Sequence, residues 1–140
     1  MAELYCLDSD VLIWQMRNTA KRASIASYLG ALAAESFACS ATTIAEIEQG
    51  MRVGEEQTTR AVLDPLQCHP IDRAVAARAG RVVRDLKVRG ITIHLADAIV
   101  AATCLVHDLT LVTLNLRDFR NIPGLRVAPP PPTESATEPA

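Results

Sequence analysis

Four carboxylates in this chain stand where short apolar segments give way to predicted helices: Asp8, Glu46, Asp97 and Asp118. No pair of cysteines or histidines lies close to them in the sequence, and oxygen ligands alone suit Mg²⁺ or Mn²⁺ better than Zn²⁺. A divalent pair held by carboxylates activates water and stabilises the attacking and leaving oxygens of an in-line phosphodiester displacement. Residue types and spacing therefore indicate metal-dependent phosphodiester hydrolysis.

The first two acids also have ordinary structural explanations. Asp8 and Asp10 both precede or open a predicted helix, where aspartate caps free amides, and Asp10 is the better placed of the two for capping. Glu46 ends the sequence Thr43-Ile44-Ala45-Glu46, which matches a capping box. In the functional interpretation, Asp8 and Glu46 instead point into one crevice.

The other two acids are equally ambiguous when taken singly. Asp97 precedes an apolar helical run, whose positive dipole end stabilises an anion. Asp118 follows another apolar segment and is explained as a turn residue paired with Arg117 or Arg120. Capping does not explain why several acids recur at strand-to-helix junctions. Their convergence would be costly unless a cation compensated the charge.

Short apolar segments alternating with helical patterns are typical of a parallel sheet covered on both faces. The sequence thus predicts a three-layer α/β/α fold with a central parallel sheet, in which sites lie at the carboxyl ends of the strands. We expect strands at 4–7, 37–41, around Ile71, 109–114 and 125–127, and helices at 11–17, 20–34, 43–51, 55–66, 73–89 and 97–107.

Length and composition bound the organisation of the chain. A length of 140 residues with 49% hydrophobic and 21% charged residues predicts one domain with a real core. That domain is expected to span 1–127. The segment 128–140 begins with a proline run and has little apolar content, so we expect it to be disordered.

Charge, cysteines and hydropathy exclude several classes. A net charge of -2 argues against a broad duplex-DNA-binding face. The cysteines Cys6, Cys39, Cys68 and Cys104 are too widely spaced for a common zinc motif and are expected to be small core residues in a reducing cytoplasm. With neither a secretory leader nor a membrane span in the pattern, we expect a cytoplasmic protein.

Four segments of the chain resemble the motifs of PIN domains. They are Leu7-Asp8-Ser9-Asp10-Val11-Leu12-Ile13, Ser40-Ala41-Thr42-Thr43-Ile44-Ala45-Glu46-Ile47, Ala96-Asp97-Ala98-Ile99-Val100-Ala101-Ala102-Thr103 and Leu111-Val112-Thr113-Leu114-Asn115-Leu116-Arg117-Asp118-Phe119. Their order and spacing are similar to those of VapC toxins from bacterial toxin-antitoxin pairs. The resemblance implies a PIN-like fold and a Mg²⁺- or Mn²⁺-dependent endoribonuclease that a VapB antitoxin holds inactive, and it favours a homodimer.

The same resemblance implies roles for individual residues. Asp8 and Asp97 match the principal metal ligands, Glu46 matches a ligand or a residue that orients water, and Asp118 matches the fourth acid. Ser9 and Asn115 would give hydrogen-bonding support. Some PIN domains have an aspartate where this chain has Asn115, so either Asp118 serves as the fourth acid or the second metal site is weak and one metal suffices.

Cations for substrate binding are concentrated in 72–90. This segment contains six arginines and lysines and only two acids, Asp72 and Asp85, so its net charge is +4. Arg78, Arg81 and Arg84 recur every three residues and are the predicted RNA-binding residues. The alternative is an ordinary solvated helix face.

The first two helices also carry apolar residues that could form a groove for a partner helix: Val11, Leu12, Ile13, Trp14, Ile25 and Leu29. Ordinary core packing explains the same residues.

Three other functions compete with the nuclease. A HAD-like phosphatase would use Asp8 and Asp10, but Leu12 stands where that motif has Thr or Val, and the only lysines, Lys21 and Lys87, lack a phosphate-binding context. A receiver-type signalling domain also needs a lysine after a late strand. A non-catalytic PIN interaction module is the third alternative, although all four acids are present.

Overall fold

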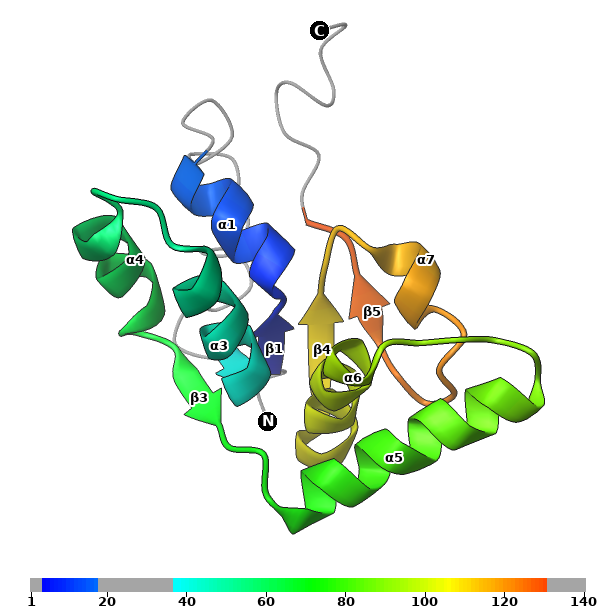
Figure 1. Cartoon of the computed structure of the whole chain (residues 1–140). Helices are drawn as coiled ribbons and strands as arrows, with labels where there is room; N and C mark the ends of the chain where they lie inside the picture. Colours follow the sequence, from blue (N-terminus) through cyan, green and yellow to red (C-terminus); the bar gives the residue numbers. More distant parts are fainter. Residues whose placement is uncertain (1–3, 18–36, 131–140) are drawn as a thin grey trace, which may run out of the picture.

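The computed structural model describes residues 4–17 and 37–130, which build a five-stranded, all-parallel sheet of order β3-β2-β1-β4-β5 (Figure 1). Each strand is short, and β2 and β4 are buried along their whole length, as expected when a sheet is covered on both faces. The strands are β1 (Leu4–Leu7), β2 (Phe37–Ser40), β3 (Gln67–His69), β4 (Leu109–Val112) and β5 (Val127–Ala128).

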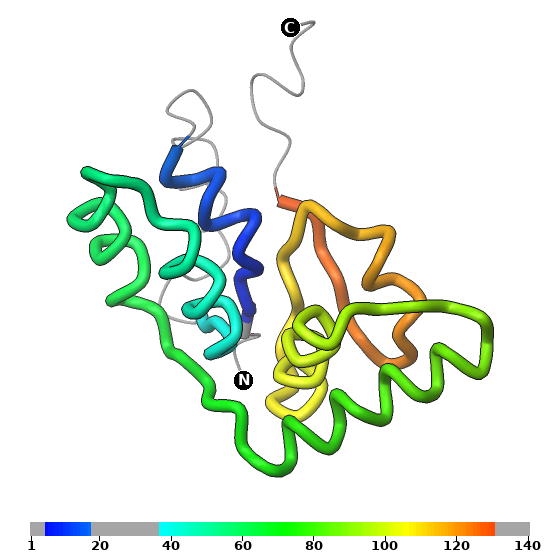
Figure 2. The backbone as a smooth tube through the Cα atoms, viewed as in Figure 1, coloured from blue at the N-terminus to red at the C-terminus, as the bar shows by residue number. Residues whose placement is uncertain are grey.

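Helices cover the two faces in separate groups, which pack in two separate hydrophobic clusters. In Figure 2 the segments 41–63 lie together on the left and 73–107 together at the lower right. One group is α1 (Ser9–Arg17), α3 (Ala41–Gly50) and α4 (Glu56–Leu63). The other is α5 (Arg73–Val88) and α6 (Leu95–His107), and the short α7 (Leu116–Phe119) follows β4. The predicted three-layer α/β/α fold is confirmed.

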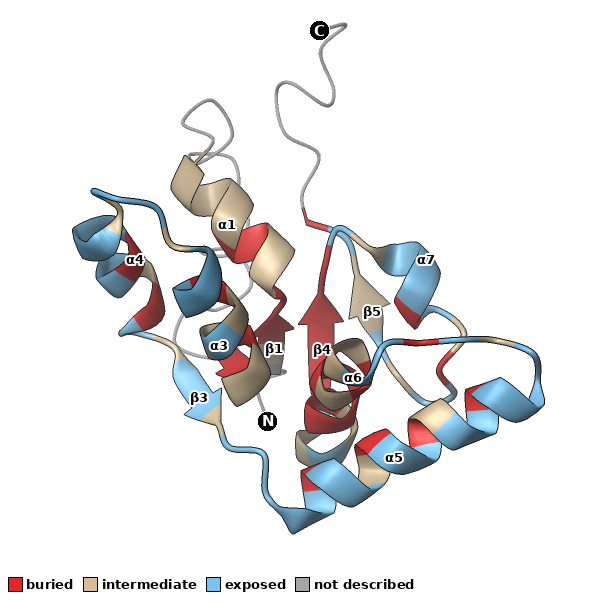
Figure 3. Ribbon diagram, viewed as in Figure 1, coloured by how far each residue is buried: buried red, intermediate tan, exposed pale blue. Residues whose placement is uncertain are grey.

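Two hydrophobic clusters hold these layers together. Successive residues of β1 enter opposite clusters, because side chains alternate along a strand: Cys6 packs on the α5–α6 side and Leu7 on the α1–α3–α4 side. The inward faces of the helices are correspondingly buried, and their outer faces are exposed (Figure 3). Phe119 is fully buried and fixes α7 against the α5–α6 cluster.

Several predicted bounds differ from the structure. The third strand lies at 67–69, before Pro70, whereas the prediction centred it on Ile71, which is 43% exposed. Pro70 has no amide to donate to a ladder, and Asp72 accepts a hydrogen bond from the Val75 amide and caps α5, so residues 70–72 form a connection. The predicted helix 20–34 lies outside the described residues.

The sheet also extends further than predicted at its last strand. The Thr113 amide donates to the Ala128 carbonyl at 3.2 Å, and Pro130 is buried. The core therefore continues past 127, and the expectation of disorder for 131–140 falls on residues that the structure does not describe. No helix in the described ranges is long and apolar enough to cross a membrane.

Ser40 is the N-cap of α3, and we expect Ser40→Ala to lower the free energy of unfolding by about 1–2 kcal/mol. Its hydroxyl accepts from the Thr42 amide at 3.2 Å and lies 3.4 Å from the Thr103 hydroxyl, so alanine would leave a partly buried amide without this partner. Urea unfolding of both proteins measures the difference. Thr58→Ala, at an exposed position of α4, is the control, and an equal loss in both variants would contradict the capping role.

Candidate metal centre at the carboxyl edge of the sheet

Asp8 lies between the ends of the two central strands. Its amide donates to the Val112 carbonyl at 3.0 Å, which continues the β1–β4 pairing by one residue. Its carboxylate accepts from the Ser9 amide at 2.9 Å and, through the other oxygen, from the Thr113 hydroxyl at 2.8 Å. Only 6% of Asp8 is exposed. The side chain is therefore fixed at the carboxyl edge, as the sequence predicted.

Asp10 has a role that the sequence interpretation missed. It was expected to cap the helix, but α1 begins at Ser9 and the Leu12 amide bonds to the Asp8 carbonyl, so Asp8 occupies the cap position. The Asp10 carboxylate instead accepts from the Leu114 amide at 3.3 Å. It thereby joins the start of α1 to the chain leaving β4, a contact between segments more than a hundred residues apart.

Glu46 is not part of a capping box. Because Ser40 caps α3 and the helix begins at Ala41, Glu46 is the sixth helical residue and lies beyond the first turn. Its side chain is half-buried; burial and the charge of Asp8 raise its pKa, and a hydrogen bond with the Ser9 side chain partly opposes this rise. The capping explanation is therefore wrong, and Glu46 faces the same region as Asp8.

Asp97 and Asp118 come from α6 and α7. Asp97 lies in the first turn of α6, and its pKa is raised by burial and then by the charges of Asp8 and Asp118, while His94 lowers it. The Asp118 side chain is exposed and accepts a hydrogen bond from the Asn115 amide group at 2.8 Å. Its partner among the described residues is thus Asn115 and neither of the neighbouring arginines.

Arginines neutralise some acids of the chain through ion pairs, but not, among the described residues, the acids of this edge. Arg17 pairs with Glu55 and lowers its pKa to about 2, and Arg60 pairs with Glu48. No ion pair within 4–17 and 37–130 reaches the edge acids. Burial raises the pKa of Asp8, and burial together with the Asp8 charge raises the pKa of Asp10 to about 6.

The donor set suits a hard divalent cation. The carboxylate of Asp8, directly after β1, raises the pKa of Glu46 on α3 and of Asp97 on α6, and the charge of Asp118 raises the pKa of Asp97 further. Among the described residues, no three acidic, cysteine or histidine side chains already enclose an ion-sized space. Mg²⁺ usually keeps several water ligands and binds through one or two carboxylates, so a preformed protein cage is not required.

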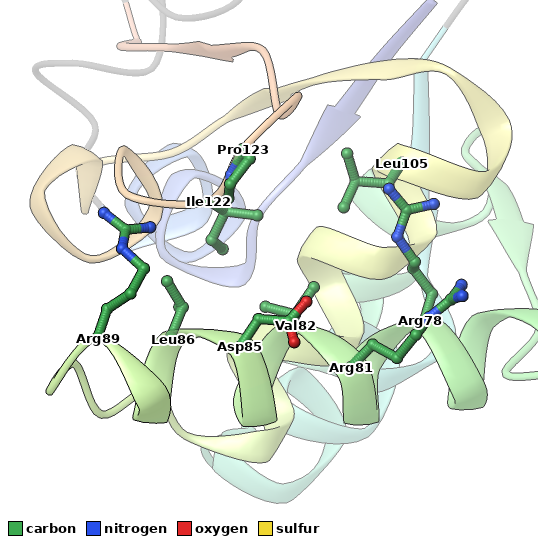
Figure 4. A pocket seen from close by; sticks show the side chains of 9 residues that line it. All are labelled: Arg78, Arg81, Val82, Asp85, Leu86, Arg89, Leu105, Ile122 and Pro123. Atoms are coloured by element: carbon green, nitrogen blue, oxygen red, sulfur yellow. The ribbon is translucent and has the colours of Figure 1, made fainter.

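The predicted RNA-binding arginines lie elsewhere on the molecule. Arg78 and Arg81 line a cavity of about 360 Å³ beside α5, whose lining also includes the aliphatic side chains of Leu86 and Leu105 (Figure 4). Leu105 is eight residues beyond Asp97 in α6, which corresponds to roughly 12 Å along the helix axis. Arg84 does not line this cavity and lies 4.0 Å from Asp85. The arginines thus stand apart from the acidic edge.

The chain resembles known proteins in family, sequence and structure. Residues 5–125 match the PIN domain. Ribonuclease VapC10 of Mycobacterium tuberculosis is 34% identical over 113 residues, which cover 81% of this chain and 84% of the relative. A toxin-antitoxin complex from Klebsiella pneumoniae contains a chain that is 31% identical with a TM-score of 0.71, covering 91% of this chain and 98% of that one.

Further solved structures agree in fold. FitAcB from Neisseria gonorrhoeae is 26% identical with a TM-score of 0.79 and covers 91% of this chain and 98% of its own. DNA-bound VapBC from Salmonella typhimurium is 22% identical with a TM-score of 0.80 and the same coverage, and at that identity it shows the fold alone.

Asp10 makes the metal-free fold less stable as the pH rises. Its pKa is about 6 in the folded protein against an ordinary 3.8, so the folded state holds the extra proton between these values. The free energy of unfolding therefore falls as the pH increases from about 4 to 6, and it stays at the lower value above pH 6. We expect Asp10→Asn to raise the free energy of unfolding by about 1–2 kcal/mol at pH 7.5 and by little at pH 4, allowing for solvent screening.

Urea unfolding in EDTA at the two pH values measures this difference. Asparagine retains an oxygen that can accept the Leu114 amide, so the contact survives while the charge is removed. Asp64→Asn, at an exposed position after α4, serves as the matched control. An unchanged pH dependence in Asp10→Asn would contradict the assignment.

Proposed function

The chain belongs to the PIN domain family, and from this we propose that it is a divalent-metal-dependent endoribonuclease acting as the toxin of a toxin-antitoxin pair. The observation that carries the proposal is the uncompensated charge of Asp8, Glu46 and Asp97, which come from three distant segments. The charge of Asp8 raises the pKa of both Glu46 and Asp97. The likeness to Ribonuclease VapC10 over most of both chains supports RNA as the substrate.

In this proposal Asp8 and Asp97 hold Mg²⁺ or Mn²⁺, with Glu46 and Asp118 beside them. The bound ion would supply Lewis acidity and a more acidic water. The chain itself fixes the ligands: Thr113 and the Ser9 amide hold the Asp8 carboxylate from two sides. Asn115 holds Asp118 in the same supporting manner. These hydrogen bonds reduce the rearrangement needed when the ion binds.

A VapB-type antitoxin is the proposed partner, because VapBC and other toxin-antitoxin complexes are among the solved structures that this chain resembles. The predicted partner groove is smaller than the sequence suggested. Val11 and Leu12 are fully buried in the core, so among the described residues only Ile13 and Trp14, both half-buried, stay candidates for contact with a partner helix. Ile25 and Leu29 lie outside the described residues. Homodimerisation stays a proposal from family likeness.

The RNA-binding role of Arg78, Arg81 and Arg84 is proposed as contact with RNA away from the scissile phosphate. Guanidinium groups bind phosphates strongly, and their distance from Asp97 places them beyond the reacting bond. A ribonuclease needs such cations, because the acidic edge alone repels RNA. The comparisons do not favour the phosphatase or the non-catalytic alternatives.

Removing a metal-binding carboxylate should abolish RNA cleavage and metal binding together. We expect Asp8→Asn and Asp97→Asn each to lower the cleavage rate by at least about 100-fold, by analogy with the loss of a positioned catalytic group. Both should also lose the rise in melting temperature that Mg²⁺ or Mn²⁺ gives the wild-type chain. Cleavage of structured RNA with and without EDTA, and thermal unfolding with each ion, measure the two effects.

Glu56→Gln removes one exposed acid from α4 and is the matched control, expected to behave as wild type in both assays. Cleavage that persists in EDTA would argue against metal dependence. Release of phosphate from small monoesters, without RNA cleavage, would favour the phosphatase.

The arginines should affect RNA affinity and leave the chemical step unchanged. For Arg78→Gln with Arg81→Gln, we expect weaker binding of RNA and a log–log salt dependence whose slope is smaller by about 1.4–1.8, because two phosphate contacts are lost. Single-turnover cleavage at saturating RNA should keep the wild-type rate. Arg52→Gln, an exposed change outside α5, is the control. An unaltered salt slope would assign these residues to an ordinary solvated helix face.

A further inference from the structure

Two cysteines face each other across the outer strands of the sheet. Cys39 on β2 and Cys68 on β3 are register partners in a parallel pair. Neighbouring strands lie about 4.8 Å apart, and partners in register direct their side chains to the same face. Disulfides bridge Cα atoms that are about 4.4–6.8 Å apart, so the usual spacing of paired strands is compatible with a disulfide between register partners.

Their surroundings give the two thiols different access to solvent. Cys39 is fully buried, whereas Cys68 is exposed on β3, an edge strand of three residues. Figure 3 shows β3 as an exposed strand next to the buried centre of the sheet. The thiols interact: burial and the neighbouring Cys68 both raise the pKa of Cys39 to about 12. The sequence interpretation placed all four cysteines in the core, and Cys68 is the exception.

The other cysteine pair provides an internal comparison. Cys6 and Cys104 also interact with each other, but both are buried, and they lie in the α5–α6 cluster. Strand alternation places Cys39 on the opposite face, since its neighbour Ala38 belongs to the α5–α6 cluster. Only the Cys39–Cys68 pair therefore combines a solvent-accessible thiol with a buried one next to it.

We propose that Cys39 and Cys68 form an oxidisable dithiol, which a small soluble disulfide such as oxidised glutathione converts into an intramolecular disulfide. The Cys68 thiolate attacks one sulfur of the small disulfide, forms a mixed disulfide and releases one thiolate. Cys39, after losing its proton, attacks the Cys68 sulfur and releases the second thiolate. One small disulfide is reduced to two thiols, and the two cysteines are oxidised to one disulfide.

The disulfide would enclose residues 40–67, which include Glu46 on α3 and all of α4. Closing this loop restricts the unfolded chain, so oxidation should raise the melting temperature by several degrees. It would also tie the edge strand to the strand that leads into the Ser40 cap. Because the pair is defined by strand register, its oxidation does not depend on the proposed nuclease activity.

The test uses the full chain, reduced and then incubated with oxidised glutathione at pH 8. Free thiols are alkylated under denaturing conditions, and the protein is digested without reductant for mass spectrometry. We expect a peptide pair joined through Cys39 and Cys68, an intact mass lower by about 2 Da before alkylation, and a higher melting temperature. Dithiothreitol should reverse all three changes.

Cys68→Ser and Cys68→Ala change an exposed position and should form no internal disulfide, with an unaltered melting temperature after the same treatment. Their circular dichroism spectra check that they remain folded. A stable glutathione adduct at Cys68 in the wild-type chain, a Cys6–Cys104 link, or a disulfide between two copies of the chain would each overturn the proposal.

Discussion

The burial of neighbouring carboxylates at one edge of the sheet is the constraint on which the rest of this structure depends. Asp8, Glu46 and Asp97 all have raised pKa values, and in each case burial is the largest cause. A folded protein does not gain stability from such a group. The acids persist because the scaffold holds them: Asp8 has hydrogen bonds to both carboxylate oxygens and an amide that belongs to the sheet pairing.

Burial of the sheet on both faces makes this concentration of charge possible. Leu7 enters one hydrophobic cluster and Cys6 the other, so β1 cannot shift its register by one residue without exchanging the two. Asp8 follows Leu7 directly, so the register of β1 also fixes the position of Asp8. The same holds for α6, in which Ala98, Ala101 and Ala102 are fully buried and fix the first turn that carries Asp97. Packing energy from the core thus offsets the electrostatic cost at the edge.

Much of this arrangement could be predicted from the sequence, because apolar runs that end in an acid identify strand ends, and parallel strands share one carboxyl edge. What could not be predicted depends on pairing between distant segments. The Asp10 contact with Leu114 spans over a hundred residues, and the sequence favoured a local capping role. The stacking of His69 on His107, with ring centroids 3.9 Å apart, likewise joins a strand to a helix end without any local pattern. The exposure of Cys68 follows from its edge strand, whose position the sequence placed three residues too late.

The separation between acids and arginines has a physical advantage for a nuclease. If Arg78 and Arg81 lay beside Asp8 and Asp97, they would form ion pairs with them, as Arg17 does with Glu55, and would lower the pKa values that are now raised. Paired carboxylates bind a divalent cation less strongly, because the arginine already neutralises their charge. With the cations on α5 and the acids at the strand ends, each set would keep its charge for the ligand proposed for it: phosphate for the arginines and metal for the carboxylates. The parallel sheet, which places α5 at the end of the molecule away from the carboxyl edge (Figure 1), is what keeps the two sets apart.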